Sequence, residues 1–223
     1  ASLTRNKIIR RIAASKKYQS LYGKTIERVV IDCLEKYPEK AVQAQREVEQ
    51  KARQLLHQIW GVFYPTRPDF NKLLKTFETE IKSGKSVKEA VWPILERHAS
   101  TKERISFLDQ FYNQIFQITG QPKTIVDLAC GLNPLTYFWL PKGIKYFGFD
   151  IDQEQAQFLA SVFKLLKVNH VKIGLGDVFV DRFPKADVVF LLKILPLIRQ
   201  QQKTQSLEIL EKQDAKYLVV SFP

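Results

Sequence analysis

The sequence predicts a basic helical part followed by an open α/β domain with a parallel sheet. Residues 1–118 contain apolar stripes with helical spacing and no segment that alternates with period two. After Gly120 come five short runs rich in Val, Ile and Phe, and helix-length segments separate several of them. Strands that alternate with helices pair in parallel in a doubly wound sheet. We therefore predict two domains, 1–100 and 101–223.

The helices of the first part are predicted by apolar spacing and by prolines. A long helix starts near Glu39, and its apolar stripe consists of Val48, Ala52, Leu55, Ile59 and Phe63. Pro65 and Pro68 end this helix, and the next one begins near Asp69. Residues 100–103, Ser-Thr-Lys-Glu, form a predicted capping box that starts an amphipathic helix reaching residue 116.

Acidic residues stand where the predicted strands of the second part end. The predicted strands are 123–129, 145–151, 170–178, 187–193 and 216–222, and 153–166 and 195–211 are predicted helices. In open sheets the ligand lies beyond the carboxyl ends of the strands, and Asp127, Asp150, Asp152 and Asp177 are placed there. A single strand-end Asp is more often a helix cap or turn residue. Such residues at three successive strand ends favour a ligand site, with Asp150 spaced from Asp127 as a ribose-binding carboxylate would be.

The turn after the first strand, "ACGLNPL" at 129–135, helps to distinguish the candidate ligands. A dinucleotide needs three glycines, because its pyrophosphate must approach bare backbone at a helix N-terminus. This turn offers only Gly131, followed by Leu132 and Pro134, which we expect to stop a helix. S-adenosylmethionine has no phosphate, so the turn fits this sulfonium cofactor better than NAD.

The net charge of +12 is concentrated in the helical part. Residues 1–120 hold 22 Lys and Arg against 13 Asp and Glu, a bias typical of polyanion binding, nucleic acid above all. A solubilising surface is the other interpretation. The apolar runs are too short to span a bilayer, the N-terminus does not resemble a secretory signal, and Cys33 and Cys130 form no metal-binding pattern. We expect a cytoplasmic protein without a metal, and a monomer, since no coiled-coil seam is present.

Two residues near the predicted capping box are further candidates. Arg104 could pair bidentately with the carboxylate of the cofactor. His98, taken alone, is more typical of a buried or capping histidine than of a catalyst.

Several motifs together resemble the aminoglycoside-resistance 16S rRNA (guanine-N7) methyltransferases. These motifs are "HASTKERI…LDQFYNQIF", "VDLACGLNPL", "GFDI", "GDV", "KILPL" and "VVSFP", in order along the chain, with "ASKKY" at 14–18 before them. The resemblance implies a Rossmann-like class I methyltransferase domain that uses S-adenosylmethionine and releases S-adenosylhomocysteine. It implies a helical domain that docks on 16S rRNA in the 30S subunit, and methylation that blocks kanamycin and gentamicin. Family members continue beyond "SFP", so we expect C-terminal strands to be missing here.

The resemblance also implies the roles of individual residues. Arg104 would contact the methionine carboxylate, Asp150 the ribose and Asp177 the adenine edge. The residues that match cofactor positions are His98, Arg104, Ala129, Gly131, Asp150, Ile151, Asp177, Val178 and Leu192. Those assigned to the target guanine and the reacting methyl group are Lys193 and Leu195, and those assigned to RNA are Arg10, Arg11, Lys16 and Lys17.

The residues after the fourth strand favour the same reaction. Methylases of exocyclic adenine nitrogens have Asn/Asp-Pro-Pro-Tyr/Phe there, whereas this chain has Lys193-Ile194-Leu195-Pro196. Cytosine C5 methylation needs a thiolate nucleophile, and neither cysteine is suitably placed. Guanine N7 carries an unprotonated lone pair and needs only in-line placement. A methyltransferase with another substrate and a non-catalytic RNA-binding module remain the alternatives.

Overall fold

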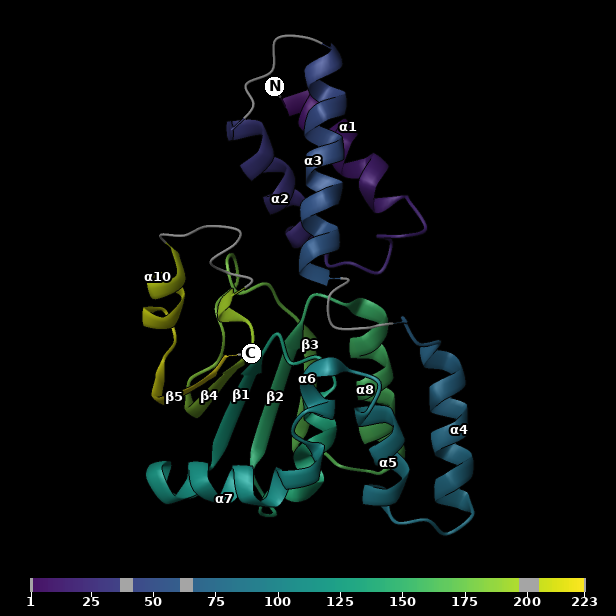
Figure 1. Ribbon diagram of the computed structural model, residues 1–223, viewed down its shortest axis with the longest axis vertical. Coiled ribbons are helices and arrows are strands. Elements are labelled where there is room, and N and C mark those ends of the chain that lie inside the picture. Colours follow the sequence, from purple (N-terminus) through teal and green to yellow (C-terminus); the bar gives the residue numbers. More distant parts are fainter. Residues whose placement is uncertain (1, 37–41, 61–65, 197–204, 223) are drawn as a thin grey trace.

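The computed structural model describes residues 2–36, 42–60, 66–196 and 205–222. Helices α1 (Ser2–Ala13), α2 (Gly23–Lys36) and α3 (Val42–Trp60) pack against one another. They form a helical unit that stands beyond one end of the sheet, at the top of Figure 1. Its core consists of Ile8, Ile12, Tyr18, Leu21, Ile26, Val29, Val30, Cys33, Val48, Ala52, Leu56 and Ile59. The predicted helical stripe is confirmed as far as Ile59, and Phe63 lies outside the described residues.

The strands of the second part form one parallel sheet, as predicted. They are β1 (Thr124–Leu128), β2 (Lys145–Asp150), β3 (Val171–Leu175), β4 (Ala186–Leu192) and β5 (Ala215–Ser221), in the spatial order β3-β2-β1-β4-β5. The order reverses between β1 and β4, which is the switch point where open sheets bind ligands. The second part also contains the 3₁₀ helix η3 (Asn133–Trp139) and helices α8 (Gln153–Leu165) and α10 (Gln205–Glu211).

Neighbouring strand residues point to opposite faces of the sheet and enter two separate cores. Ile125 and Val188 belong to one hydrophobic cluster, whereas Val126 and Val189 belong to the other. The first cluster also contains residues of the helices α4 (Phe70–Lys82), α5 (Val87–Leu95) and α7 (Leu108–Thr119). Figure 1 shows α4 and α5 beside α8, and α7 across the end of the sheet away from the helical unit. These three helices therefore share their core with the sheet, and the domain division near residue 100 stays a prediction.

The prediction of a capping box at residues 100–103 is wrong. Ser100 lies inside the four-residue helix α6 (Ala99–Lys102), and the chain continues through the 3₁₀ helix η2 (Ile105–Phe107) into α7. The Ser100 hydroxyl instead accepts a hydrogen bond from Arg104. The capping box occurs at the start of α5, where Ser86 and Glu89 cap each other reciprocally. Both segments have the pattern Ser-x-x-Glu, so local sequence does not separate them.

Two further expectations are modified by the structure. Pro134 does not stop a helix but lies in the first turn of η3, where its missing N–H costs nothing. Of the helix predicted over 195–211, residues 195–196 and 205–211 are helical, and 197–204 lie outside the described residues. In the described part of the chain, no helix is both long and apolar enough to cross a membrane.

The helical unit is attached to the sheet through the segment that follows β2. The Tyr22 N–H donates to the Ile151 carbonyl at 2.8 Å, and the Gln153 N–H donates to the Ser20 carbonyl at 2.8 Å. Between these two bonds, Leu21 and Asp152 form an isolated antiparallel bridge. The start of α2 is thereby fixed to the carboxyl end of β2.

Candidate functional site

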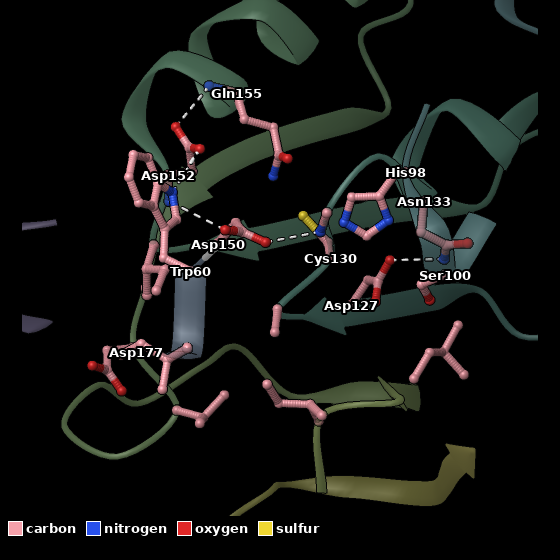
Figure 2. Close-up of a pocket in the computed structure, with 18 of the residues that line it drawn as sticks. Trp60, His98, Ser100, Asp127, Cys130, Asn133, Asp150, Asp152, Gln155 and Asp177 are labelled. Carbon is pink, nitrogen blue, oxygen red and sulfur yellow. Dashed lines mark hydrogen bonds between the residues drawn. The ribbon is translucent and has the colours of Figure 1, made fainter. Parts of the chain in front are cut away.

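A pocket lies at the carboxyl ends of β1, β2 and β3, the edge of an open parallel sheet where ligands bind. Figure 2 shows His98, Ser100, Asp127 and Asn133 at one end of it, and Trp60, Asp152, Gln155 and Asp177 at the other. All the predicted cofactor residues line this pocket: His98, Arg104, Ala129, Gly131, Asp150, Ile151, Asp177, Val178 and Leu192. Residues from distant parts of the sequence are thus brought to one cavity.

The turn after β1 depends on its single glycine. Gly131 has φ of +52°, and a Cβ atom built there would lie 2.7 Å from two atoms of the His98 ring. A side chain at this position would therefore collide with the imidazole. His98 is buried, and burial lowers its pKa to about 4, so the ring is neutral near pH 7. Ala129, two residues earlier, also has a left-handed φ of 51°, a strained conformation typical of functional turns.

Asp150 at the end of β2 faces this turn. One carboxylate oxygen accepts the Gly131 N–H at 2.8 Å, and the other accepts the Asp152 N–H at 3.1 Å. Burial raises the pKa of Asp150 to about 6 despite these bonds. Since the carboxylate is anchored by backbone groups and lines the pocket, its remaining lone pairs can accept hydrogen bonds from a ligand.

Arg104 is a buried cation whose hydrogen-bond partners are neutral. Its guanidinium donates to Ser100 Oγ at 2.9 Å and to Asn133 Oδ1 at 3.1 Å. Its Nε has no hydrogen-bond partner among the described residues, and both groups that accept from its other nitrogens are uncharged. Burial lowers its pKa, but an arginine stays charged at neutral pH. A buried guanidinium without an anionic partner is a suitable site for a carboxylate from outside the protein.

Asp127 belongs to the same buried polar network as Arg104. It accepts hydrogen bonds from Asn133 at 2.9 Å and from the Tyr146 hydroxyl. Asn133 therefore links the carboxyl group of Asp127 to Arg104. Burial raises the pKa of Asp127 to about 7, so both of its protonation states are accessible near neutral pH. The network holds the guanidinium in place through side chains that are themselves fixed.

The helical unit forms part of the wall of the pocket. Ile59 and Trp60, at the end of α3, are lining residues. The Trp60 Nε1 donates to Asp152 Oδ2 at 2.9 Å, and Arg67 donates to both carboxylate oxygens of Asp152. The Arg67 guanidinium also lies over the Trp60 ring, 4.4 Å from its centroid. Asp152 additionally caps α8 by accepting the Gln155 N–H. Because Asp152 follows β2 and also binds Trp60, its buried carboxylate joins α3 to the sheet.

The two residues predicted to face the substrate do not line the pocket. Lys193 follows β4 with a left-handed φ of 62°, and its ammonium group pairs with Glu103. Leu195 is buried in the hydrophobic cluster on the other face of the sheet. Ile194, between them, is the lining residue. The roles of Lys193 and Leu195 stay predictions.

The predicted RNA-binding residues lie on the helical unit. Arg10, Arg11, Lys16 and Lys17 are exposed. Lys16 and Lys17 line a second, shallow groove together with Gln19, Ser20, His57, Trp60, Arg67 and Glu154. Trp60 is common to this groove and to the pocket. The described residues contain no group of three or more His, Cys, Asp or Glu that could hold a metal ion.

Some lining residues could not be identified from the sequence. Arg28, Ile59 and Trp60 enter the pocket through the docking of the helical unit, and no local pattern indicates that docking. Ser100 has the sequence context of a helix cap, although its place in the "HASTKER" motif could have suggested the site. Asn133 follows the single glycine of the turn by two residues, where its amide could have been recognised as a candidate.

Several known proteins are similar to this chain in sequence and in architecture. A "16S rRNA (guanine(1405)-N(7))-methyltransferase" of Frankia casuarinae is 33% identical over 223 residues, covering 95% of this chain and 75% of the relative. The structure of the 16S rRNA methylase RmtB matches with a TM-score of 0.80 and 30% identity, covering 98% of this chain and 84% of RmtB. The 16S rRNA methyltransferase RmtF in complex with S-adenosyl-L-homocysteine matches with a TM-score of 0.80 and 26% identity, covering 99% and 81%. The family model "Ribosomal RNA methyltransferase (FmrO)" matches residues 14–223, and the chain belongs to this family.

Proposed function

We propose that the protein transfers a methyl group from S-adenosylmethionine to N7 of guanine 1405 in 16S rRNA, and so confers resistance to aminoglycosides such as kanamycin and gentamicin. The relatives named for this reaction cover nearly the whole chain. S-adenosylhomocysteine, bound to RmtF, is the product that such a transfer releases. Ribosomes supply the substrate in the cytoplasm.

The observation that carries the proposal is the buried Arg104 guanidinium at one end of a pocket with strand-end carboxylates at the other. The cofactor has a carboxylate at one end and an adenosine at the other, and the ribose hydroxyls and adenine amino group of that adenosine donate hydrogen bonds, so its polarity matches that of the pocket. Arg104 would bind the methionine carboxylate, Asp150 the ribose and Asp177 the adenine. Ala129, Gly131, Ile151, Val178, Leu192 and His98 would line the rest of the cavity.

When bound, the cofactor supplies an electrophilic methyl group on its sulfonium. The chain has to place guanine N7 in line with that group, because the N7 lone pair is already available. Such positioning supplies much of the rate enhancement of a bimolecular step. It requires no general base, and burial, which lowers the pKa of His98 to about 4, makes the imidazole beside Gly131 a weak base.

The helical unit would bring the RNA to the pocket within the 30S subunit. Its exposed Arg10, Arg11, Lys16 and Lys17 suit phosphate contacts. The target guanine would leave its stack to reach the methyl group, at a cost of a few kcal/mol. Lys193 would anchor the flipped nucleotide after exchanging its Glu103 partner for a phosphate or a carbonyl oxygen.

The test is to incubate the protein with 30S subunits and labelled S-adenosylmethionine, then to cleave the rRNA with borohydride and aniline at 7-methylguanine. One cleavage at guanine 1405 is expected. The Arg104→Gln variant serves as the matched control and should show no incorporation. Label at another position would indicate a methyltransferase with a different target. Binding to subunits without incorporation would indicate an RNA-binding module.

A further inference from the structure

The loop after β3 is held from outside the sheet by a buried arginine of the helical unit. Arg28 is in the middle of α2, and its side chain is 8% exposed. Its Nε donates to Asp177 Oδ2 at 3.1 Å. Its guanidinium lies over the Phe179 ring, 4.1 Å from the centroid, and a third contact joins it to Asp32 one turn along α2 at 3.4 Å. The contacts with Asp177, Phe179 and Asp32 together therefore fix the position of the Arg28 guanidinium.

These contacts determine the orientation of the Asp177 carboxylate. Its Oδ1 accepts the Phe179 N–H at 2.9 Å, while Oδ2 accepts from Arg28. Each carboxylate oxygen can accept more than one hydrogen bond, so these two bonds orient the group without saturating it. Asp177 is 2% exposed, and Arg28, Asp177 and Phe179 all line the pocket.

A second ion pair on the same loop provides a contrast. Lys24, one turn earlier on α2, pairs with Asp181 at 2.7 Å, and its side chain is 57% exposed. Neither residue lines the pocket. Lys24 therefore ties α2 to the loop at the surface, where an ion pair contributes little, whereas Arg28 acts on a carboxylate inside the cavity.

We propose that Arg28 is a positioning residue that directs the Asp177 carboxylate at the exocyclic amino group of the cofactor's adenine. The inference rests on the proposed function, because it takes S-adenosylmethionine as the occupant of the pocket. The adenine amino group donates hydrogen bonds, and a carboxylate is the strongest acceptor that the loop offers. Arg28 thus makes adenine recognition depend on the helical unit, through its hydrogen bond to Asp177.

The test compares two ligands that differ at this amino group and at the neighbouring ring nitrogen N1, which accepts a hydrogen bond in adenine and carries a hydrogen in hypoxanthine. S-adenosylhomocysteine carries the amino group, and S-inosylhomocysteine has an oxygen in its place. Isothermal titration calorimetry measures both dissociation constants for the wild type and for Arg28→Gln. We expect the wild type to prefer S-adenosylhomocysteine by about tenfold or more, since a hydrogen bond to a charged group contributes that much. Arg28→Gln should lose this preference while its affinity for S-inosylhomocysteine changes little.

Two further variants separate positioning from general stability. Arg28→Lys keeps a charge but not the planar guanidinium, so it should retain part of the preference. It also supplies the comparison if Arg28→Gln does not fold. Lys24→Gln removes the surface ion pair on the same loop and should leave both affinities within about twofold of the wild type.

Three results would overturn the inference. An equal loss of affinity for both ligands in Arg28→Gln would make Arg28 a structural tether only. An unchanged preference would show that Asp177 is oriented without it. A wild type that binds both ligands equally would remove the amino group as the recognised feature. A wild type that binds neither would refute the proposed function as well, and so is distinguishable from these three.

Discussion

Replacement of Gly131 by alanine tests the close contact between the turn after β1 and His98. An L residue in the left-handed region bears a backbone cost of about 1–2 kcal/mol. At Gly131 the new Cβ would also lie 2.7 Å from the His98 ring, and overpacking of this kind costs about 1–3 kcal/mol. We therefore expect Gly131→Ala to reduce the free energy of unfolding by about 2–5 kcal/mol.

Gly143→Ala is the matched control for this variant. Gly143 has φ of +87°, and a Cβ atom added there would have nothing within 4 Å. That φ lies farther from the range of L residues than the +52° of Gly131, so its backbone cost is at least as large. If Gly131→Ala lowers the free energy of unfolding by more than Gly143→Ala does, the difference must therefore come from the contact with the imidazole of His98.

Urea denaturation of the full chain, followed by circular dichroism, measures both variants. The double variant Gly131→Ala/His98→Ala removes the ring and should recover the overpacking cost relative to the two single changes. Equal destabilisation by Gly131→Ala and Gly143→Ala would refute the reasoning, because the contact would then contribute nothing.

Three other predictions concern protonation and RNA. Burial raises the pKa of Asp127 from 3.8 to about 7, so the folded state binds the carboxyl proton of Asp127 more tightly than the unfolded state does. The resulting stabilisation of the folded state is present at pH 4 and is lost as the pH rises through 7. Asp127→Asn should therefore gain stability relative to the wild type between pH 4 and 8, by at most roughly 1.4 kcal/mol per pH unit; a pH-independent difference in urea titrations would contradict this. Lys193→Ala should lower methyl transfer to 30S subunits about tenfold without changing the affinity for S-adenosylhomocysteine. Glu103→Gln, the control, should not lower methyl transfer. Equal transfer rates for the wild type and Lys193→Ala would exclude the anchoring role. Replacing Lys16 and Lys17 by Gln should reduce the slope of log affinity for 30S subunits against log salt by roughly 1.4–1.8, and an unchanged slope would place the phosphate contacts elsewhere.

The parallel sheet could be predicted because its signals are local. Short apolar runs, acidic strand ends and one glycine in the first turn correspond to β1–β5 and to the lining of the pocket. The prediction of a capping box at 100–103 is wrong because two segments share the Ser-x-x-Glu pattern, and only the contact between Ser100 and Arg104 distinguishes them.

The remaining wall of the pocket could not be predicted because it is built by docking. Trp60 and Arg67 meet Asp152, and Arg28 meets Asp177, over separations of 85 to 149 residues. None of these pairs has a local signature, since each depends on how α2 and α3 lie on the loops after β2 and β3. The roles assigned to Lys193 and Leu195 stay predictions for a different reason: the partners that these roles require come from outside the chain.

The short antiparallel bridge between Leu21 and Asp152 has a consequence for recombination between relatives. After a crossover that exchanges residues 1–60, the residues at positions 28 and 60 and the backbone partners of residues 151–153 would all come from one parent. The carboxylates that receive them, Asp152 and Asp177, would come from the other parent. Where the two parents differ at these contacts, a viable chimaera has to inherit the first helices together with the loops after β2 and β3, even though nearly a hundred residues lie between α3 and the end of β2.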